Sequence, residues 1–182
     1  MAERISTQPW KRVLLFCDNA GADMMGMLLL ARQLVHLCGE DTKVMLVANS
    51  TPALNDITYA ELDQYLEAAA GSDAVLAEMV AKGQVQCSES GQTSTLLDLA
   101  RIGPELNDWV TKEMIQVEDP SDWLLVLDGM GRSLESNWNA ATYMLPGVTV
   151  LTCAMIKSEV NAQRLDADVY DCIVRMVVAE TS

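Results

Sequence analysis

The sequence predicts an α/β fold: a Rossmann-like, doubly wound and mainly parallel sheet of about six strands. Short, fully apolar segments alternate along the chain with longer segments of helical periodicity. The strand candidates are apolar throughout, as expected for a parallel sheet that helices cover on both faces. Polar loops separate these segments, so several loops are expected to meet at one edge of the sheet.

The first half of the chain contains three strand candidates and three helix candidates. Thr58 and Glu61 have the spacing of a capping box at the start of a helix. Gly83 stands where a helix ending near Lys82 would have its C-terminal glycine. The expected strands are Val13–Cys17, Lys43–Ala48 and Val85–Ser88, and the expected helices are 22–38, one from about Tyr59, and one from about Ser72 to Lys82.

The second half repeats the alternation. Gly103 and Pro104 are typical of a helix start, because proline is favoured in the first turn. Ser158 can cap a short helix that runs to Leu165. The expected elements are a helix from about Glu105, an acidic loop at Met114–Ser121, strands at Asp122–Leu127, Val148–Met155 and Tyr170–Val178, and the short helix before the last strand.

The composition indicates a single α/β domain over residues 1–182. Hydrophobic residues make up 50% of the sequence, which is enough for the core of one domain of this length. Residues 1–10 are polar and are expected to be frayed, although Trp10 can pack. No apolar run reaches the roughly 20 residues that cross a bilayer, and the first residues lack a secretory signal. We therefore expect a soluble, cytoplasmic protein.

Charge and rare residues exclude several classes of function. The formal net charge of −14 argues against nucleic acid and anionic membranes as partners, because both attract basic surfaces. The five cysteines are widely spaced without a C-x-x-C pair, which favours reduced thiols. The single histidine, His36, lies in a helical apolar pattern, so histidine-based catalytic triads are excluded.

The ends of the first two strands carry oxygen donors. Asp18 and Asn19 follow the first strand, and Asp56 lies in the loop after the second strand. Carboxylate and amide oxygens suit a divalent cation such as Mg²⁺ or Mn²⁺ better than zinc. The alternative is that Asp56 and its neighbour Asn55 only form an Asx-turn and cap the helix at Tyr59.

Two further loops add possible anion contacts. Gly129 lets the backbone approach a ligand, and Arg132 can grip a phosphate group. Lys157 follows an apolar strand, where its ammonium group can bind an anion or simply extend into water. The loop Gly91–Thr95 can cradle an anion or be a plain solvated turn. The P-loop and dinucleotide-binding motifs are absent, and Ala20 stands where an aspartyl-phosphate mechanism needs a second aspartate.

Taken together, the loops resemble the DUF89 family of metal-dependent damage-control phosphatases, in particular the branch fused to the C-terminus of eukaryotic pantothenate kinases. The matching strings are Asp18-Asn19-Ala20-Gly21-Ala22-Asp23, Ala48-Asn49-Ser50, Pro52-Ala53-Leu54-Asn55-Asp56-Ile57-Thr58, Asp98-Leu99, Gly129-Met130-Gly131-Arg132, Ser136-Asn137, Met155-Ile156-Lys157 and Tyr170-Asp171-Cys172. This resemblance implies that Asp18, Asn19 and Asp56 bind the catalytic metal, which can be Mg²⁺, Mn²⁺, Co²⁺ or Ni²⁺. It also implies a small phosphate ester as substrate, with 4′-phosphopantetheine and its damaged forms associated with this branch.

The sequence departs from that branch in several places. Asp128 stands where the branch usually has glutamate, Ser136 replaces threonine, and the string 165–167 replaces Leu-Gly-Gly. The helical region that precedes the first strand in the family is also not found in residues 1–10. We therefore expect a more open site, which a second copy of the chain or a helical partner can cover.

Three functions remain open at this point. The first is a metal-dependent phosphatase, in which Asp23 orients the attacking water, acts as a base or only complements the helix dipole. The phosphate contacts expected in that case come from Asn49, Ser50, Gly129, Arg132, Asn137 and Lys157, with the backbone N–H groups of Asn49 and Ser50 offsetting phosphate charge. The second is a non-catalytic ligand-binding or assembly domain, and the third is an S-adenosylmethionine-dependent carboxyl methyltransferase.

Overall fold

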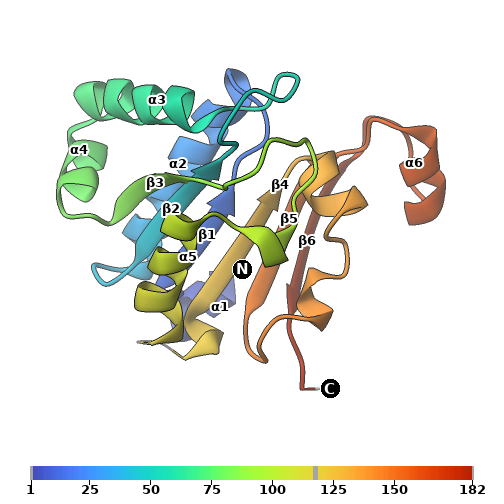
Figure 1. Cartoon of the computed structure of the whole chain (residues 1–182). Helices are drawn as coiled ribbons and strands as arrows, with labels where there is room; N and C mark the ends of the chain where they lie inside the picture. Colours follow the sequence, from blue (N-terminus) through green and yellow to red (C-terminus); the bar gives the residue numbers. More distant parts are fainter. Residues whose placement is uncertain (1, 117–118, 182) are drawn as a thin grey trace.

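The fold is a single mixed sheet with helices on both faces, which confirms the predicted α/β class. The computed structural model describes residues 2–116 and 119–181. Its strands are β1 (Arg12–Phe16), β2 (Lys43–Ala48), β3 (Val85–Glu89), β4 (Trp123–Asp128), β5 (Thr149–Met155) and β6 (Cys172–Val178). They are arranged in the order β3-β2-β1-β4-β5-β6. Strands β1 to β5 are parallel, and β6 is antiparallel to β5 (Figure 1).

Several of the helices begin at a residue whose side chain caps the helix. The α-helices are α1 (Ala2–Thr7), α2 (Ala22–Cys38), α3 (Tyr59–Ser72), α4 (Ala74–Ala81), α5 (Pro104–Trp109) and α6 (Glu159–Leu165). Short 3₁₀ turns lie at η1 (Leu99–Arg101), η3 (Pro120–Asp122) and η5 (Ala140–Thr142), and π-helical segments lie at η2 (Val110–Ile115) and η4 (Met130–Glu135). The predicted capping box is confirmed, because the side chains of Thr58 and Glu61 each accept a hydrogen bond from the other's backbone N–H.

Alternation along the central strands divides the core between the two faces of the sheet. Leu15 of β1 packs in a cluster that includes buried residues of α2, α3 and α4. Its neighbour Phe16 points to the opposite face, where it packs with Leu106 of α5 and Met114 of η2. In Figure 1, α5 lies in front of the sheet and α2 behind it. The two layers hold the sheet rigidly, so the loops at its edge have a fixed base.

The structure corrects two expectations about the ends of the chain. Residues 1–10 were expected to be frayed, but residues 2–7 form α1. Trp10 is fully buried, and its indole N–H donates to Thr149 Oγ1 at 3.2 Å. Strand β6 was expected to be covered on both faces, but its residues alternate between exposed and partly buried because it is the edge strand. Residues 1, 117–118 and 182, including part of the expected acidic loop, lie outside the described residues. None of the described helices is both long and apolar enough to cross a membrane.

Candidate active site

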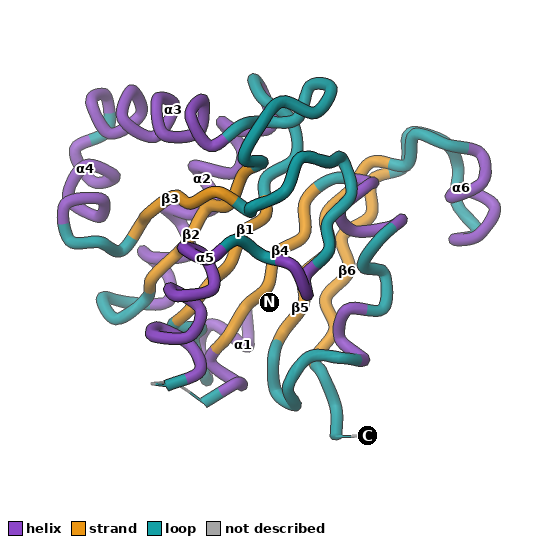
Figure 2. The backbone as a smooth tube through the Cα atoms, viewed as in Figure 1, coloured by secondary structure: helices purple, strands orange, loops and turns teal. Residues whose placement is uncertain are grey.

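The predicted site lies at the carboxyl edge of the sheet, where the strand order reverses. From β1 the chain moves outward to β2 and β3, and it then returns to place β4 on the other side of β1. In open α/β sheets, ligands bind at such a switch point. Asp18 follows β1, Asn49 follows β2 and Asp128 ends β4. Figure 2 shows the loops gathered at this edge.

Main-chain pairing joins the loops after β1 and β2. The backbone N–H of Ile57 donates to the Asp18 carbonyl at 2.9 Å, and that of Ala20 donates to the Asn55 carbonyl at 3.0 Å. This places Asn19 opposite Asp56 in an isolated antiparallel bridge. The alternative assigned Asn55 and Asp56 to an Asx-turn that caps the helix at Tyr59. Its capping part is wrong, because Thr58 is the N-cap.

Arg132 connects the two buried carboxylates. Its guanidinium group donates to Asp18 Oδ1 at 2.6 Å and to Asp56 Oδ2 at 2.8 Å. The Arg132 and Asp56 side chains are each 3% exposed, and that of Asp18 is 12% exposed. We expected Arg132 to grip a phosphate group, but in this structure its guanidinium is committed to the two carboxylates. A charge-assisted contact of this kind fixes the separation and orientation of both groups.

Gly129 makes room for the Asp18 carboxyl group. It has a φ of +87°, a conformation that favours glycine, and a Cβ atom added there would overlap the carboxyl group of Asp18. Its backbone N–H donates to the Cys153 carbonyl at 2.9 Å, so it is already paired within the fold. Gly129 therefore lies next to the site, as expected. It contributes by leaving room for the Asp18 carboxyl group, and its N–H is not free to bind a ligand.

Amide side chains also donate hydrogen bonds to these carboxylates. Asn19 Nδ2 donates to Asp18 Oδ2 at 2.8 Å and to Asp23 Oδ2 at 2.7 Å. Asn55 Nδ2 donates to Asn19 Oδ1 at 2.6 Å. Asn49 Nδ2 donates to Asp56 Oδ2 at 3.2 Å and to the Ser94 carbonyl at 3.0 Å, which links the site to the loop after β3. The amide orientation is set by this hydrogen-bond network.

Three expected phosphate contacts are directed elsewhere. The backbone N–H groups of Asn49 and Ser50 donate to the carbonyls of Ile57 and Gln92, so they are already paired. Asn137 is 4% exposed and supports the fold: its Nδ2 donates to the carbonyls of Leu97 and Arg132, and its Oδ1 accepts from Tyr143. These groups were expected to bind phosphate, but each already has a hydrogen-bond partner within the protein, as buried polar groups generally do.

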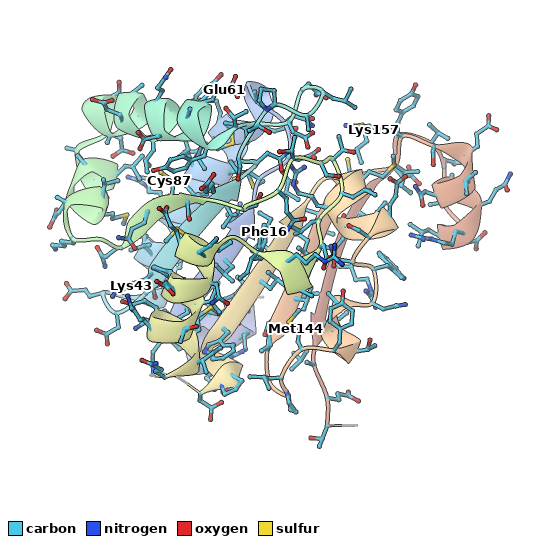
Figure 3. All side chains as sticks on the ribbon, viewed as in Figure 1. Phe16, Lys43, Glu61, Cys87, Met144 and Lys157 are labelled. Carbon is cyan, nitrogen blue, oxygen red and sulfur yellow. The ribbon has the colours of Figure 1, made fainter. Side chains whose placement is uncertain are left out.

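A cavity of about 410 Å³ opens beside these carboxylates. Its charged end is formed by Asp18, Asp23, Asp128 and Lys157 together with the Asn19 amide. Figure 3 places Lys157 at this edge of the sheet, far from Lys43, which begins β2. The structure therefore brings Lys157 to the same cavity as Asp18 and Asn19, two of the three predicted metal ligands, whereas Asp56 does not line it.

Burial and crowding of like charges perturb two carboxyl groups. Burial raises the pKa of Asp18, and the neighbouring Asp56 acts in the same direction, while Arg132 and Lys157 act in the opposite one. Burial together with the charges of Asp18 and Asp23 raises the pKa of Asp128 to about 7. Repulsion of this kind indicates that the site has an excess of negative charge.

The donor set fits a divalent cation. Arg132 takes one oxygen of Asp18 and one of Asp56, which leaves the second oxygen of each outside this ion pair. With all groups ionised, the four carboxylates of the site carry four negative charges, whereas Arg132 and Lys157 carry two positive charges, which leaves two negative charges without a counter-charge. The four are Asp18, Asp23 and Asp128, which line the cavity, and Asp56, which pairs with Arg132. Among the described residues, no group of three carboxylate, thiol or imidazole side chains could hold a metal ion. A three-ligand site here would therefore have to include the Asn19 amide oxygen, which accepts from Asn55 Nδ2 in this structure.

Asp128 and the apolar half of the cavity were not recognised as site features from the sequence. Asp128 stands at the end of an apolar strand, as Asp18 does. This position could have identified Asp128 as a site residue from the sequence. The apolar half is formed by α2, β5 and β6, and the pairing of β6 beside β5 cannot be read from local sequence.

Fold and site together define a Rossmann-like α/β protein with an arginine-bridged carboxylate site at the switch point of its sheet. The family model described as the damage-control phosphatase ARMT1-like domain matches residues 1–173. The chain therefore belongs to this family, which confirms the resemblance found in the sequence.

Several known relatives support the assignment. Pantothenate kinase 2 of Oryza sativa subsp. japonica is 35% identical over 91% of this chain and 19% of its own length. Damage-control phosphatase At2g17340 of Arabidopsis thaliana is 31% identical over 90% of this chain and 40% of its own length. The 4′-phosphopantetheine phosphatase of Mus musculus is 25% identical over 97% of this chain and 26% of its own length. The chain thus spans less than half the length of each of these relatives.

A solved structure shows the same fold. The DUF89 family protein from Pyrococcus horikoshii superposes with a TM-score of 0.63 and 13% sequence identity, covering 95% of this chain and 49% of that protein. At this identity the comparison bears on the fold alone.

Proposed function

We propose that this chain is a metal-dependent phosphatase that hydrolyses small phosphate monoesters. The observation that carries the proposal is that Asp18 and Asn19 line one cavity together with Lys157. Asp56 does not line this cavity, but it pairs with Asn19 and is joined to Asp18 through Arg132. Oxygen donors beside a cation are what a phosphate ester and a divalent metal ion together require. Membership of a damage-control phosphatase family supports the same reaction class.

The metal would be held by Asp18, Asn19 and Asp56, with Mg²⁺, Mn²⁺, Co²⁺ and Ni²⁺ as candidates. When bound, it would polarise a phosphoryl oxygen and increase the acidity of a coordinated water. Arg132 keeps the two carboxylates in position before any ligand arrives, so little reorganisation is needed. The Lys157 ammonium group offsets phosphate charge from the β5 side of the cavity.

Asp23 has a positioning role in this proposal. Its Oδ2 accepts a hydrogen bond from the Asn19 amide, so it orients the third metal ligand. Asp23 also lines the cavity, where its exposed carboxylate can hold the hydrogen of an attacking water. Because it lies in the first turn of α2, it also complements the helix dipole, and the two contributions can coexist.

The candidate substrate is 4′-phosphopantetheine or a damaged phosphometabolite. The mouse relative, a 4′-phosphopantetheine phosphatase of whose length the chain spans 26%, supports this candidate. The test is release of inorganic phosphate from an aryl phosphate and from 4′-phosphopantetheine, with each of the four metal ions and without metal. Metal-dependent release from either ester is expected, and no release with any metal would contradict the proposal.

Site variants connect that activity to the predicted ligands. Asp56→Asn should abolish turnover and weaken Mn²⁺ binding measured by calorimetry, because it removes a carboxylate ligand. Asp108→Asn, which changes an exposed aspartate of α5, is the matched control and should leave both unchanged. Unaltered Mn²⁺ affinity in Asp56→Asn would remove the ligand assignment. Metal and phosphate binding without turnover would instead favour a non-catalytic ligand-binding domain.

Lys157 is tested separately. Loss of one charge-assisted hydrogen bond to phosphate costs about 1.5–3 kcal/mol, so Lys157→Met should weaken inhibition by inorganic phosphate roughly tenfold or more. Mn²⁺ affinity should change little. Equal inhibition of wild type and variant would show that Lys157 only extends into solvent.

A further inference from the structure

The cavity at the candidate active site has a second, apolar end. Beyond the charged groups, its walls are made by small, aliphatic and sulphur-containing residues of four elements. They are Ala22, Gly26 and Met27 of α2, Met130 of η4, Cys153, Ala154 and Met155 of β5, and Cys172, Ile173 and Val174 of β6. Methionine fills irregular spaces adaptably, so this wall can accommodate a flexible apolar group.

The apolar end exists because the sheet is uncovered there. Cys153 of β5 pairs with Val174 of β6, and Met155 pairs with Cys172, so these four side chains share one face. This is the face on which α2 packs, since Cys153 contacts the cluster that α2 helps to form. Helix α2 does not extend over β6, and Val174 is 75% exposed and Met155 is 43% exposed. Exposed apolar surface continuous with a candidate site is a typical ligand-binding feature.

Gly26 keeps the helix side of the cavity open. Within a helix, glycine is less favourable than alanine by about 0.8–1 kcal/mol. A Cβ atom at Gly26 would meet no other atom within 4 Å, so packing against the protein does not require glycine there. The missing side chain instead leaves space in the wall of the cavity, one helical turn from Ala22.

We propose that this end binds the alcohol part of the phosphate ester, and that the preferred substrates have an extended, largely apolar alcohol rather than a sugar. This inference rests on the proposed function, because the phosphate group must occupy the charged end. The hydroxyl groups of a sugar would be buried against Met27, Met155 and Val174, where they would lose hydrogen bonds with water. An alkyl group would gain from the same burial.

The test is a chain-length series of affinities in the presence of Mn²⁺, measured as competitive inhibition of aryl phosphate hydrolysis, because the proposed activity would consume the esters during a calorimetric titration. The probes are inorganic phosphate, methyl phosphate, butyl phosphate, hexyl phosphate and glucose 6-phosphate. In the wild type, affinity should rise from methyl to hexyl phosphate by up to about fourfold for each buried methylene. Glucose 6-phosphate should bind no better than methyl phosphate.

Gly26→Leu is the decisive variant, and Gly71→Leu is its matched control. Gly71 lies in α3, outside the cavity, and a Cβ atom there also meets nothing within 4 Å. Both variants replace a helical glycine, so thermal unfolding should show that both remain folded. Gly26→Leu should flatten the chain-length dependence without changing the affinity for inorganic phosphate, whereas Gly71→Leu should change neither.

The opposite wall supplies an independent pair of variants. Val174→Ser makes the β6 side of the cavity polar, and Val178→Ser makes the same change at an exposed position of β6 outside the cavity. Only Val174→Ser should weaken hexyl phosphate binding. If inorganic phosphate binds but affinity does not depend on chain length, the apolar subsite is overturned, whereas the proposed function is decided separately by the phosphate-release assay. If no phosphate species binds the wild type, both proposals fail.

Discussion

Removing Arg132 should make the stability of this protein depend on metal ions. Arg132→Met leaves Asp18 and Asp56 facing each other without the guanidinium group that bridges them at 2.6 and 2.8 Å. Because the three side chains are largely buried, loss of the shared cation should cost about 3–5 kcal/mol. For a chain of this size, that corresponds to a decrease in Tm of roughly 6–20 °C. The measurement is thermal unfolding by circular dichroism in a chelator.

Added Mn²⁺ should restore part of the lost stability. A divalent ion at 100 times its Kd stabilises the folded state by about 2.7 kcal/mol. Its effect should be larger in Arg132→Met than in the wild type, where Arg132 already balances part of the charge. Arg175→Met is the control, because that guanidinium donates to the Trp138 carbonyl and lies 4.3 Å from the centre of the Trp138 ring, away from these carboxylates.

A double-mutant cycle with Asp56→Asn separates charge from packing. If repulsion between the carboxylates causes the instability, Asp56→Asn should recover stability in the Arg132→Met background. Additive effects of the two substitutions, or an Arg132→Met variant as stable as the wild type in chelator, would refute the bridging argument.

Two further predictions concern the loop next to the site and the start of α3. Gly129→Ala should weaken Mn²⁺ binding measured by calorimetry, because its Cβ displaces the Asp18 carboxyl group, whereas Gly39→Ala adds strain at a φ of +108° with no atom within 4 Å and should leave Mn²⁺ affinity intact. Equal affinities would show that Asp18 moves without consequence. The hydrogen bonds from Thr58 lower the pKa of Glu61. The ionised Glu61 therefore stabilises the folded state above the unfolded pKa of about 4.3, and this stabilisation is lost as pH falls through the lower folded pKa. In urea titrations Glu61→Gln should therefore be less stable than wild type at pH 7, with a smaller difference below about pH 4; a constant difference would contradict this.

Local sequence signals identified most of the fold. Continuous apolar runs located the strands, and the Thr58–Glu61 spacing located the start of α3. The reversal of β6 could not be predicted, because its apolar sequence is compatible with a buried parallel strand, and only its place at the sheet edge exposes one face. The π-helical segments η2 and η4 were also not predicted, since their backbone hydrogen bonds leave no residue pattern in this chain.

The candidate site was likewise predictable only in part from local sequence. The strand-end position predicted that Asp18 and Asp56 lie together, because parallel strands end at one edge. The partner of Arg132 was not predictable, since a long side chain near this edge can reach either a phosphate or a carboxylate. Asn137 was assigned to phosphate, but its amide bonds the Leu97 carbonyl, 40 residues away in sequence. Contacts over such a separation depend on the whole fold.

The bridge between Asp18 and Arg132 joins positions 114 residues apart. Strands β1 and β4, which carry these two positions, are neighbours in the sheet, yet β2 and β3 with their helices lie between them in the chain. A folding intermediate that contains only β1, β2 and β3 would hold Asp18, Asn19 and Asp56 without their arginine. During folding, the acidic cluster would therefore form before its counter-charge, and closure of β4 against β1 would be the step that relieves the repulsion. Long-range pairing of this kind is slow, so divalent ions present during refolding would act on the chain before the native site is complete.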